Sequence, residues 1–319
     1  MKAAVIHEIG EVPRYEDFPD PVAGEDEVLI DVRAVAVENV DKAVAAGTHF
    51  ASGQFLAQLP AVAGFDGIGA LADGSLVGFF GPRAPYGALA ERTVVAKTGT
   101  IPAPEGISPT VAVVISSAVT GFAIKTAAGF EPGETVLIQG ATGVAGRLAV
   151  QVARLLGAGR IVATGRDDRA LEDVRRLGAD AVINTSVSDG ELVDAFTREA
   201  GDGYDVILDF LWGRPTEALI RSLTPDRLVH NKPARLVQVG ESAGSGIALA
   251  AEAVRTSGLE ISGAAKGLDP VTIAEAYRQI VEWTRGGDLV PGIEQVPLSD
   301  IEQAWRRTDF RGKRLVIVP

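Results

Sequence analysis

The first third of the chain is a series of short apolar runs separated by glycine, proline and charged residues. The runs occupy residues 1–7, 27–37, 65–71, 75–80 and 88–96. Apolar runs of this length between turn-forming residues are typical of β-strands, so we expect a compact, partly barrel-like β domain. Residues 108–128 then form a longer apolar segment with no proline after Pro109. Its length predicts a buried helix that leads out of the β domain.

From Glu134 onward the rhythm changes to alternating strand and helix patterns. The runs that predict strands are residues 135–140, 160–165, 180–184, 204–212, 234–240 and 259–265. Helical spacing of apolar positions marks residues 147–157, 168–178, 191–201 and 215–224, which separate the first five runs. This alternation predicts an α/β fold with a doubly wound parallel sheet of the Rossmann type. The closing part, residues 271–319, returns to helix and strand signals, and we expect it to pack on the first domain.

Length and charge narrow the class of protein. At roughly 150 residues per domain, 319 residues favour two domains. The net charge of -12 repels phosphate backbones and anionic lipid, so we expect neither a nucleic-acid partner nor a membrane partner. Residues 1–11 lack a long apolar core, and no run of about 18 uncharged apolar residues follows them. The expectation is a soluble, cytoplasmic protein.

The chain contains no cysteine. Disulfides, thiolate zinc sites, iron–sulfur clusters and cysteine nucleophiles are therefore excluded by composition. The three histidines, His7, His49 and His230, are scattered without carboxylates at metal-ligand spacing, so we expect no metal site. The chain also lacks a Walker A motif, which leaves an ATPase function without support.

A glycine-rich turn follows the strand at 135–140 and leads directly into a helix. Its residues are Gly140, Ala141, Thr142, Gly143, Val144, Ala145 and Gly146. Glycines at these positions allow a tight turn and close approach of the backbone to a pyrophosphate, while the helix N-terminus supplies N–H donors. We therefore expect dinucleotide binding here. The alternative is a glycine-rich turn of an α/β protein that binds nothing.

The end of the second strand in this part indicates which dinucleotide is bound. An NAD-specific site places an acidic residue there to bind the ribose diol, whereas this chain has Gly165 followed by Arg166. A small residue leaves room for a 2'-phosphate, and a guanidinium pairs with it. These residues predict NADPH. In the alternative, Arg166 pairs with Asp167, Asp168 or solvent, and Arg169 is a second candidate for the phosphate contact.

Five segments resemble, in the same order, the zinc-independent quinone oxidoreductase branch of the medium-chain dehydrogenase/reductase superfamily. They are MKAAVIHEIG at the start, LPAVAGFDGIGAL, ALAERTVVAKTGTIPAPEGIS, ETVLIQGATGVAGRLAVQVARLLGA and GKRLVIVP at the end. The resemblance implies a GroES-like catalytic domain over residues 1–117, completed by 266–319, and a Rossmann NADP-binding domain over 118–265. It further implies a cofactor between the domains and a homodimer, with residues 259–265 as the sheet edge that pairs between subunits.

The same resemblance implies a reaction and several cofactor contacts. The reaction is hydride transfer from NADPH to a quinone or an α,β-unsaturated carbonyl, without zinc. Thr120 and Gly240 stand at positions near the nicotinamide in the family, Gly213 near the adenosine, and Lys313 at the C-terminal Gly-Lys that approaches the cofactor. Thr185 occupies a position where many relatives have a tyrosine near the 2'-phosphate, so that contact is in doubt.

On the substrate side the chain departs from the family pattern. Glu38 stands where relatives have asparagine, and Asn39 follows it. We take Glu38, Asn39 and His49 as the candidate catalytic residues. His49 lies near the position of a tyrosine that relatives use for protonation or stacking, and it is able to donate a proton at neutral pH. The alternative is that His49 is a loop residue exposed to water and has no catalytic role. Tyr86 is a candidate for the cleft wall or for simple packing.

Two other functions are compatible with the same fold. One is an enoyl-thioester reductase, which performs the same chemistry on a thioester substrate. The other is a non-catalytic, NADPH-binding regulatory protein. A small-molecule substrate, a quinone or enone, is the partner that the sequence favours.

Overall fold

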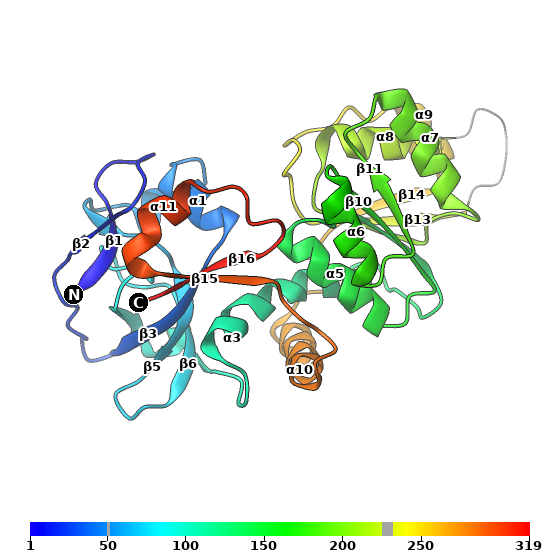
Figure 1. Ribbon diagram of the computed structural model, residues 1–319. Helices are drawn as coiled ribbons and strands as arrows, with labels where there is room; N and C mark the ends of the chain where they lie inside the picture. Colours follow the sequence, from blue (N-terminus) through cyan, green and yellow to red (C-terminus); the bar gives the residue numbers. More distant parts are fainter. Residues whose placement is uncertain (50–51, 225–231) are drawn as a thin grey trace. The chain divides into compact units, whose positions relative to one another are not determined.

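The computed structural model describes residues 1–49, 52–224 and 232–319. It divides into two compact units (Figure 1). The first comprises residues 1–116 and 291–319, and the second comprises residues 117–290.

The first unit is built on two β-sheets. One has the strand order β2-β1-β4, and the other has the order β15-β16-β3-β5-β6-β8, with β7 also paired to β3. The strands are β1 (Lys2–Ile6), β2 (Arg14–Asp17), β3 (Glu27–Val37), β4 (Ala61–Val62), β5 (Asp66–Ala70), β6 (Leu76–Phe80), β7 (Arg92–Ala96), β8 (Thr100–Pro102), β15 (Ile293–Pro297) and β16 (Arg314–Val318). All five runs that predict strands before residue 100 contain one.

Both ends of the chain contribute to this unit. The C-terminal β16 pairs antiparallel with β3, with Val316 opposite Ala36, and β15 pairs parallel with β16. In Figure 1 the red and orange strands β16 and β15 lie beside the blue β3. The core includes Ile30, Val35 and Ile317. The helical elements are α1 (Asn39–Ala45), α2 (Ser52–Phe55), α3 (Pro109–Ile115), α11 (Ile301–Arg306), η1 (Lys97–Gly99) and η3 (Leu298–Asp300).

The second unit is a six-stranded sheet in the order β11-β10-β9-β12-β13-β14, with every neighbouring pair parallel. Its strands are β9 (Thr135–Gln139), β10 (Arg160–Gly165), β11 (Ala181–Asn184), β12 (Val206–Asp209), β13 (Ala234–Gln238) and β14 (Leu259–Gly263). Its helices are α5 (Val144–Leu155), α6 (Asp168–Arg176), α7 (Asp189–Ala200), α8 (Gly213–Leu223), α9 (Ala251–Thr256) and α10 (Pro270–Gly286). This strand order is that of a doubly wound dinucleotide fold, and the predicted fold class is confirmed.

Continuous apolar strands form this sheet because both of its faces are buried. In β9, Val136 and Ile138 face the core that contains α5 and α6, whereas Leu137 faces the core that contains α7 and α8. The carboxyl ends of β9, β10, β12 and β13 therefore lie along one edge of the sheet. The loops that follow these four strands lie at that edge, and they contain the predicted glycine-rich turn.

The helix predicted over residues 108–128 is present as a continuous helical stretch from 109 to 126, but it is not a regular α-helix throughout. The segment consists of α3, the 3-10 helix η2 (Ser116–Phe122) and α4 (Ala123–Thr126). The Ser116 hydroxyl donates to the Val113 carbonyl at 3.2 Å, and the Thr120 hydroxyl donates to the Ser117 carbonyl at 2.8 Å. Local bonds of this kind compete with α-helical hydrogen bonding.

Within the described ranges, residues 109–126 are also the one helical stretch long and apolar enough to cross a membrane. Half of that stretch is buried inside the protein. Core helices of globular domains have the same composition, so this is weak evidence for a membrane span.

The boundary predicted between residues 265 and 266 also needs correction, because residues 266–290 belong to the second unit. The Trp283 ring of α10 stacks on Phe122, with 5.6 Å between ring centroids. The Gln151 side chain accepts the Val290 N–H at 2.9 Å. These contacts attach α10 and the segment after it to η2 and α5 of the second unit. Only residues 291–319 return to the first unit.

Candidate functional site

The glycine-rich turn lies at the carboxyl end of the central strand β9. Gly140 has a φ of +80°, a conformation that L side chains rarely adopt. Its N–H donates to the Thr164 hydroxyl at 3.0 Å, and the Ala141 N–H donates to the Thr164 carbonyl at 2.9 Å. Thr164, in β10, therefore holds the start of the turn against the neighbouring strand.

The turn closes on itself at Gly146. A Cβ at Gly146 would lie 2.3 Å from the Gly140 carbonyl oxygen, so only glycine fits. α5 starts at Val144 after the N-cap Gly143, which provides no side-chain acceptor. The N–H groups of Val144 and Ala145 belong to the first turn of α5, where no intrahelical acceptor exists, and the described residues provide no other. These donors suit an anionic group such as a diphosphate.

The end of β10 packs against the same turn. A Cβ at Gly165 would lie 2.3 Å from the Thr142 Cγ2 and 3.0 Å from the Leu171 Cδ2, so packing against these side chains favours glycine here. This reason differs from the one inferred from sequence, which was room for a phosphate. An acidic side chain at this position would displace Thr142.

Arg166 follows Gly165 and is exposed. Asp167 caps α6 by accepting the Ala170 N–H at 2.8 Å, and Asp168 accepts the Asn184 side-chain amide at 2.7 Å. Across residues 1–49, 52–224 and 232–319, no ion pair joins either carboxylate to Arg166. The Arg166 guanidinium therefore stays available to a ligand beside the turn.

A buried network supports the loop after β12, at the same sheet edge. The Gln139 amide donates to the Thr216 hydroxyl at 3.2 Å, which donates to the Asp209 Oδ2 at 2.6 Å. The Asp209 Oδ1 accepts the N–H groups of Leu211 at 2.8 Å and Trp212 at 3.1 Å. Burial raises the pKa of Asp209. The loop is held close to the turn, since a Cβ at Gly140 would approach Leu211 to 2.9 Å.

The other predicted cofactor residues are distributed over both units. Gly213 starts α8 with a φ of +63°, and a Cβ there would lie 2.6 Å from the Ala243 carbonyl oxygen. Gly240 follows β13 and packs against the Phe210 backbone. Both lie at the carboxyl edge of the sheet. Thr120 lies in η2 of the second unit, and Lys313 is an exposed residue of the first unit, before β16.

Thr185 does not replace the tyrosine that the family places near the 2'-phosphate. Its side chain is buried, and its hydroxyl donates to the Gly165 carbonyl at 3.2 Å. The Thr185 carbonyl accepts the Arg214 guanidinium at 2.9 Å. Thr185 is therefore part of the strand-end packing.

The first unit contains a cavity of about 310 Å³ with a mostly apolar wall. It is large enough for a small ring compound. Its walls come from β1, α1, α2, β4 and the loops that follow. The lining residues are Ile6, Asp41, Val44, Ala45, Gln54, Phe55, Leu56, Val62, Ala63, Gly64, Phe65, Gly81, Pro82, Ala84 and Tyr86.

A cluster of charged side chains lies beside this cavity. The Arg314 guanidinium, from β16, forms an ion pair with Glu38 at 3.0 Å. Asp41, in the first turn of α1, is 4% exposed, and its Oδ2 accepts the Glu38 N–H at 2.7 Å. Asp66, at the start of β5, is near enough to influence Asp41 electrostatically.

Burial changes the acidity of the two aspartates. Loss of hydration, followed by the negative charges of Asp66 and Glu38, raises the pKa of Asp41 to about 8. Burial and the charge of Glu38 raise the pKa of Asp66 to about 6. Arg314 opposes both shifts. At neutral pH, Asp41 is therefore largely protonated.

The three residues proposed for catalysis do not form one group in the wall of this cavity. Glu38 faces Arg314, Asn39 is exposed at the start of α1, and His49 is half-buried. None of the three is among the described lining residues. Sequence reasoning missed Asp41, Asp66 and Arg314. For Asp41 the sequence did contain a signal, because an acid three residues after Glu38 has the spacing of a helix-capping pair.

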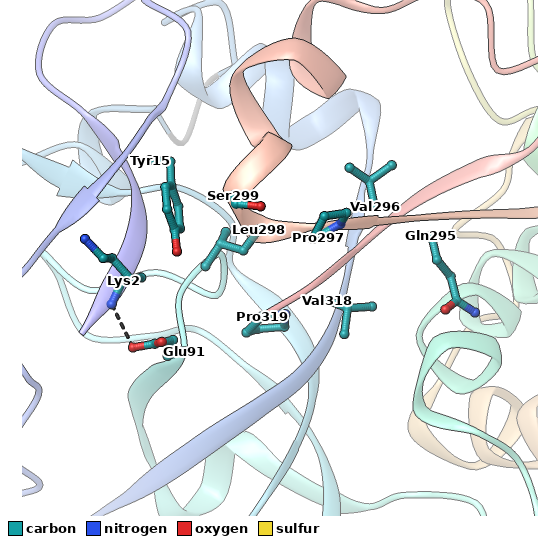
Figure 2. Close-up of a pocket in the computed structure, with 10 residues that line it drawn as sticks. All are labelled: Lys2, Tyr15, Glu91, Gln295, Val296, Pro297, Leu298, Ser299, Val318 and Pro319. Atoms are coloured by element: carbon teal, nitrogen blue, oxygen red, sulfur yellow. Dashed lines mark hydrogen bonds between the residues drawn. The ribbon is translucent and has the colours of Figure 1, made fainter.

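A second, more open cavity of about 380 Å³ lies elsewhere in the first unit (Figure 2). Lys2, Tyr15, Glu91 and residues 295–299 and 318–319 line it. Its charged groups already have partners, because the Lys2 ammonium pairs with Asp17 at 3.0 Å and Glu91 accepts the Lys2 N–H at 2.8 Å. Figure 2 shows this Glu91 contact at the cavity wall. None of the residues that line this cavity matches Asp41, whose buried Oδ1 has no hydrogen-bond partner in the described part of the chain.

Where the structure describes the chain, no three metal-ligating side chains come together. His7 accepts or donates one hydrogen bond with Glu16 at 2.9 Å. His230 lies outside the described residues.

The zinc-binding dehydrogenase model matches residues 145–240, which all lie in the second unit. A probable NADPH-dependent quinone reductase of Emericella nidulans is 27% identical over 199 residues, covering 59% of this chain and 54% of the relative. Prostaglandin reductase-3 of Bos taurus is 27% identical over 226 residues, covering 67% of this chain and 57% of the relative. The matched regions thus span little more than half of these relatives.

A solved structure matches over the whole length. The quinone oxidoreductase of Thermus thermophilus, also solved in complex with NADPH, is 27% identical to this chain, with a TM-score of 0.74. The match covers 100% of both chains.

Proposed function

We propose that the chain is an NADPH-dependent oxidoreductase of the quinone oxidoreductase branch of the medium-chain dehydrogenase/reductase superfamily, a proposal supported by the family model, the quinone reductase relatives and the solved quinone oxidoreductase. The observation that carries the proposal is the turn at 140–146, with its Val144 and Ala145 N–H groups available and Arg166 beside it. When bound, NADPH supplies a hydride to the substrate. The turn would hold the diphosphate, and Arg166 the 2'-phosphate.

Replacing Arg166 by alanine tests the cofactor assignment. Loss of a charge-assisted pair costs about 1.5–3 kcal/mol, so we expect NADPH affinity to fall roughly ten- to a hundredfold, with NADH affinity unchanged. Isothermal calorimetry with both dinucleotides measures this difference. Arg198→Ala, at an exposed position of α7, is the matched control. Equal losses for NADPH and NADH in the Arg166 variant would show that Arg166 does not bind the 2'-phosphate.

We further propose that the acceptor is a quinone or an α,β-unsaturated carbonyl bound in the cavity of about 310 Å³. The wall includes Phe55 and Phe65, whose rings stack at 5.2 Å and suit a flat, apolar compound. The small volume favours a ring compound over the long arm of an enoyl thioester. Zinc has no part in this proposal, because the chain contains no cysteine to supply a thiolate ligand.

The decisive experiment follows NADPH oxidation by purified protein with a panel of quinones, enones and enoyl thioesters, with and without a chelator. Turnover of quinones or enones that survives chelation is the expected result. Preference for thioesters would support the enoyl-reductase alternative. Binding of NADPH without turnover of any acceptor would support the regulatory alternative.

A homodimer is the proposed assembly. β14 is the edge strand of the six-stranded sheet, and its Ile261 is 42% exposed. Unpaired edge strands present a row of backbone donors and acceptors to a second copy. Sedimentation of the native protein and of an Ile261→Lys variant tests this pairing, and a monomeric native protein would refute it.

A further inference from the structure

Asp41 lines the cavity of the first unit and is the most buried charged residue near it. Its Oδ2 accepts the Glu38 N–H, but its Oδ1 is buried and has no hydrogen-bond partner in the described part of the chain. A buried carboxyl oxygen without a donor loses its hydration with no replacement. Polar groups placed in this way in an apolar wall are suited to orienting a ligand.

The charges that face Asp41 come from three elements. Glu38 flanks it at the start of α1, Asp66 faces it from β5, and Arg314 faces it from β16. Lys42, the next residue in α1, instead donates to the Trp305 carbonyl at 2.9 Å. Burial and the two acids outweigh the guanidinium and favour the protonated carboxyl. Its pKa of about 8 makes Asp41 a proton donor at neutral pH.

Other polar residues of the cavity are less suited to this role. The Tyr86 hydroxyl donates to the Asp20 carbonyl at 3.3 Å, and the Gln54 amide carries no ionisable proton. Neither combines burial with an acidic proton, as Asp41 does.

We propose that Asp41 is the general acid of the acceptor cavity, where its carboxyl O–H hydrogen-bonds the carbonyl oxygen of the acceptor and protonates it during reduction. The inference rests on the proposed NADPH-dependent function. It also defines the acceptor class as a flat, apolar compound whose carbonyl oxygen reaches Asp41 while its body lies along Phe55 and Phe65. Asp41 is thereby a catalytic residue.

The step balances without any further reactant. For an enone, the hydride supplied by NADPH forms the new C–H bond at the β carbon, and the C=C electron pair shifts toward the carbonyl oxygen. That oxygen takes the Asp41 proton, which yields an enol that tautomerises to the ketone in water. The Asp41 carboxylate then takes a proton from water. Each turnover consumes one NADPH, one proton and one acceptor.

The Asp41→Asn variant of the full chain tests this assignment. Positioned general acids contribute about 10²–10⁴-fold to rate, so we expect kcat to fall at least a hundredfold. The NADPH dissociation constant is expected to stay within about threefold. For the native protein, kcat/KM should decline above about pH 8, because the carboxyl must be protonated to act. That decline should be absent from the residual activity of the variant.

Asp66→Asn is the second variant, since it leaves the proposed acid in place. Removal of its negative charge lowers the pKa of Asp41, so the decline in kcat/KM should move to lower pH. The kcat at still lower pH should stay near that of the native protein. A merely structural role for Asp41 would produce no such shift. Thermal unfolding of both variants establishes that each is folded.

The outcomes separate the two proposals. If native protein reduces quinones or enones and Asp41→Asn keeps its kcat and pH profile, the general-acid assignment is overturned and the proposed function stands. A native pH profile that is flat between pH 7 and pH 9 also overturns the assignment. If native protein binds no NADPH, or oxidises none with any acceptor, both proposals are overturned.

Discussion

The turn of the second unit and the cavity of the first unit are built in opposite ways. The turn consists of consecutive residues, 140–146, and its donors are backbone N–H groups. The cavity is lined by side chains that lie between Ile6 and Tyr86 in the chain, and the neighbouring ion pair brings Arg314 from the C-terminal part. The turn therefore depends on the absence of side chains, and the cavity depends on which side chains converge.

The largest expected effect is at the turn. In Gly146→Ala, the new Cβ would meet the Gly140 carbonyl oxygen at 2.3 Å, so the backbone has to move. We expect NADPH affinity to fall at least a hundredfold, about 2.7 kcal/mol, as measured by calorimetry. Gly190→Ala, in α7, is the matched control, because a Cβ there meets nothing within 4 Å. Normal NADPH binding by Gly146→Ala would show that the turn is not the diphosphate site.

The second prediction concerns the charged cluster. Arg314→Gln removes the guanidinium that pairs with the partly exposed Glu38 and lowers the pKa of Asp66, and we expect a loss of about 2 kcal/mol in unfolding free energy at pH 8. Arg314 lowers the pKa of Asp66, so its removal raises that pKa further above the ordinary value. The stability loss should therefore shrink at pH 5, where Asp66 becomes neutral.

Urea unfolding at both pH values measures this difference. Arg92→Gln is the matched control, since its pair with Asp20 at 3.0 Å is exposed and should contribute less than about 1 kcal/mol. Equal losses at pH 5 and pH 8 in Arg314→Gln would contradict the electrostatic account of the cluster.

The smallest effect is expected at the apolar wall of the cavity. Phe55→Ala removes the ring that stacks on Phe65, and such pairs contribute about 0.5–1.5 kcal/mol. We expect KM for the quinone or enone to rise about three- to tenfold, with no change in NADPH affinity. Phe80→Ala, at a position of β6 that is 56% exposed, serves as control. An unchanged KM in Phe55→Ala would place the acceptor elsewhere.

Much of the second unit was predictable because its elements are local. The short apolar runs and the helical spacing identify all six strands and four of the intervening helices, and the doubly wound order follows from the handedness of parallel connections. The edge position of residues 259–263 is also confirmed. By contrast, the segment at 108–128 has helical composition throughout, but local hydroxyl bonds break it into three pieces.

The roles of individual residues were harder to predict from the sequence than the elements were. Gly165 was interpreted as leaving room for a phosphate, whereas its close packing against the Thr142 side chain is a separate reason for glycine at this position. His49 and Asn39 have residue types suited to catalysis, yet neither lines the cavity among the described residues. Asp41 was not among the predicted site residues, because the sequence does not show which acids become buried.

The sequence by itself determined the parallel sheet, the glycine turn and the absence of thiolate ligands. Each of these depends on residue type and spacing within short segments, where backbone preferences act directly. Only the tertiary structure decided where α10 packs, which residues enclose the cavity and why Asp41 holds its proton. These depend on burial and on charges brought together from distant parts of the chain, and desolvation has no signature in a linear pattern.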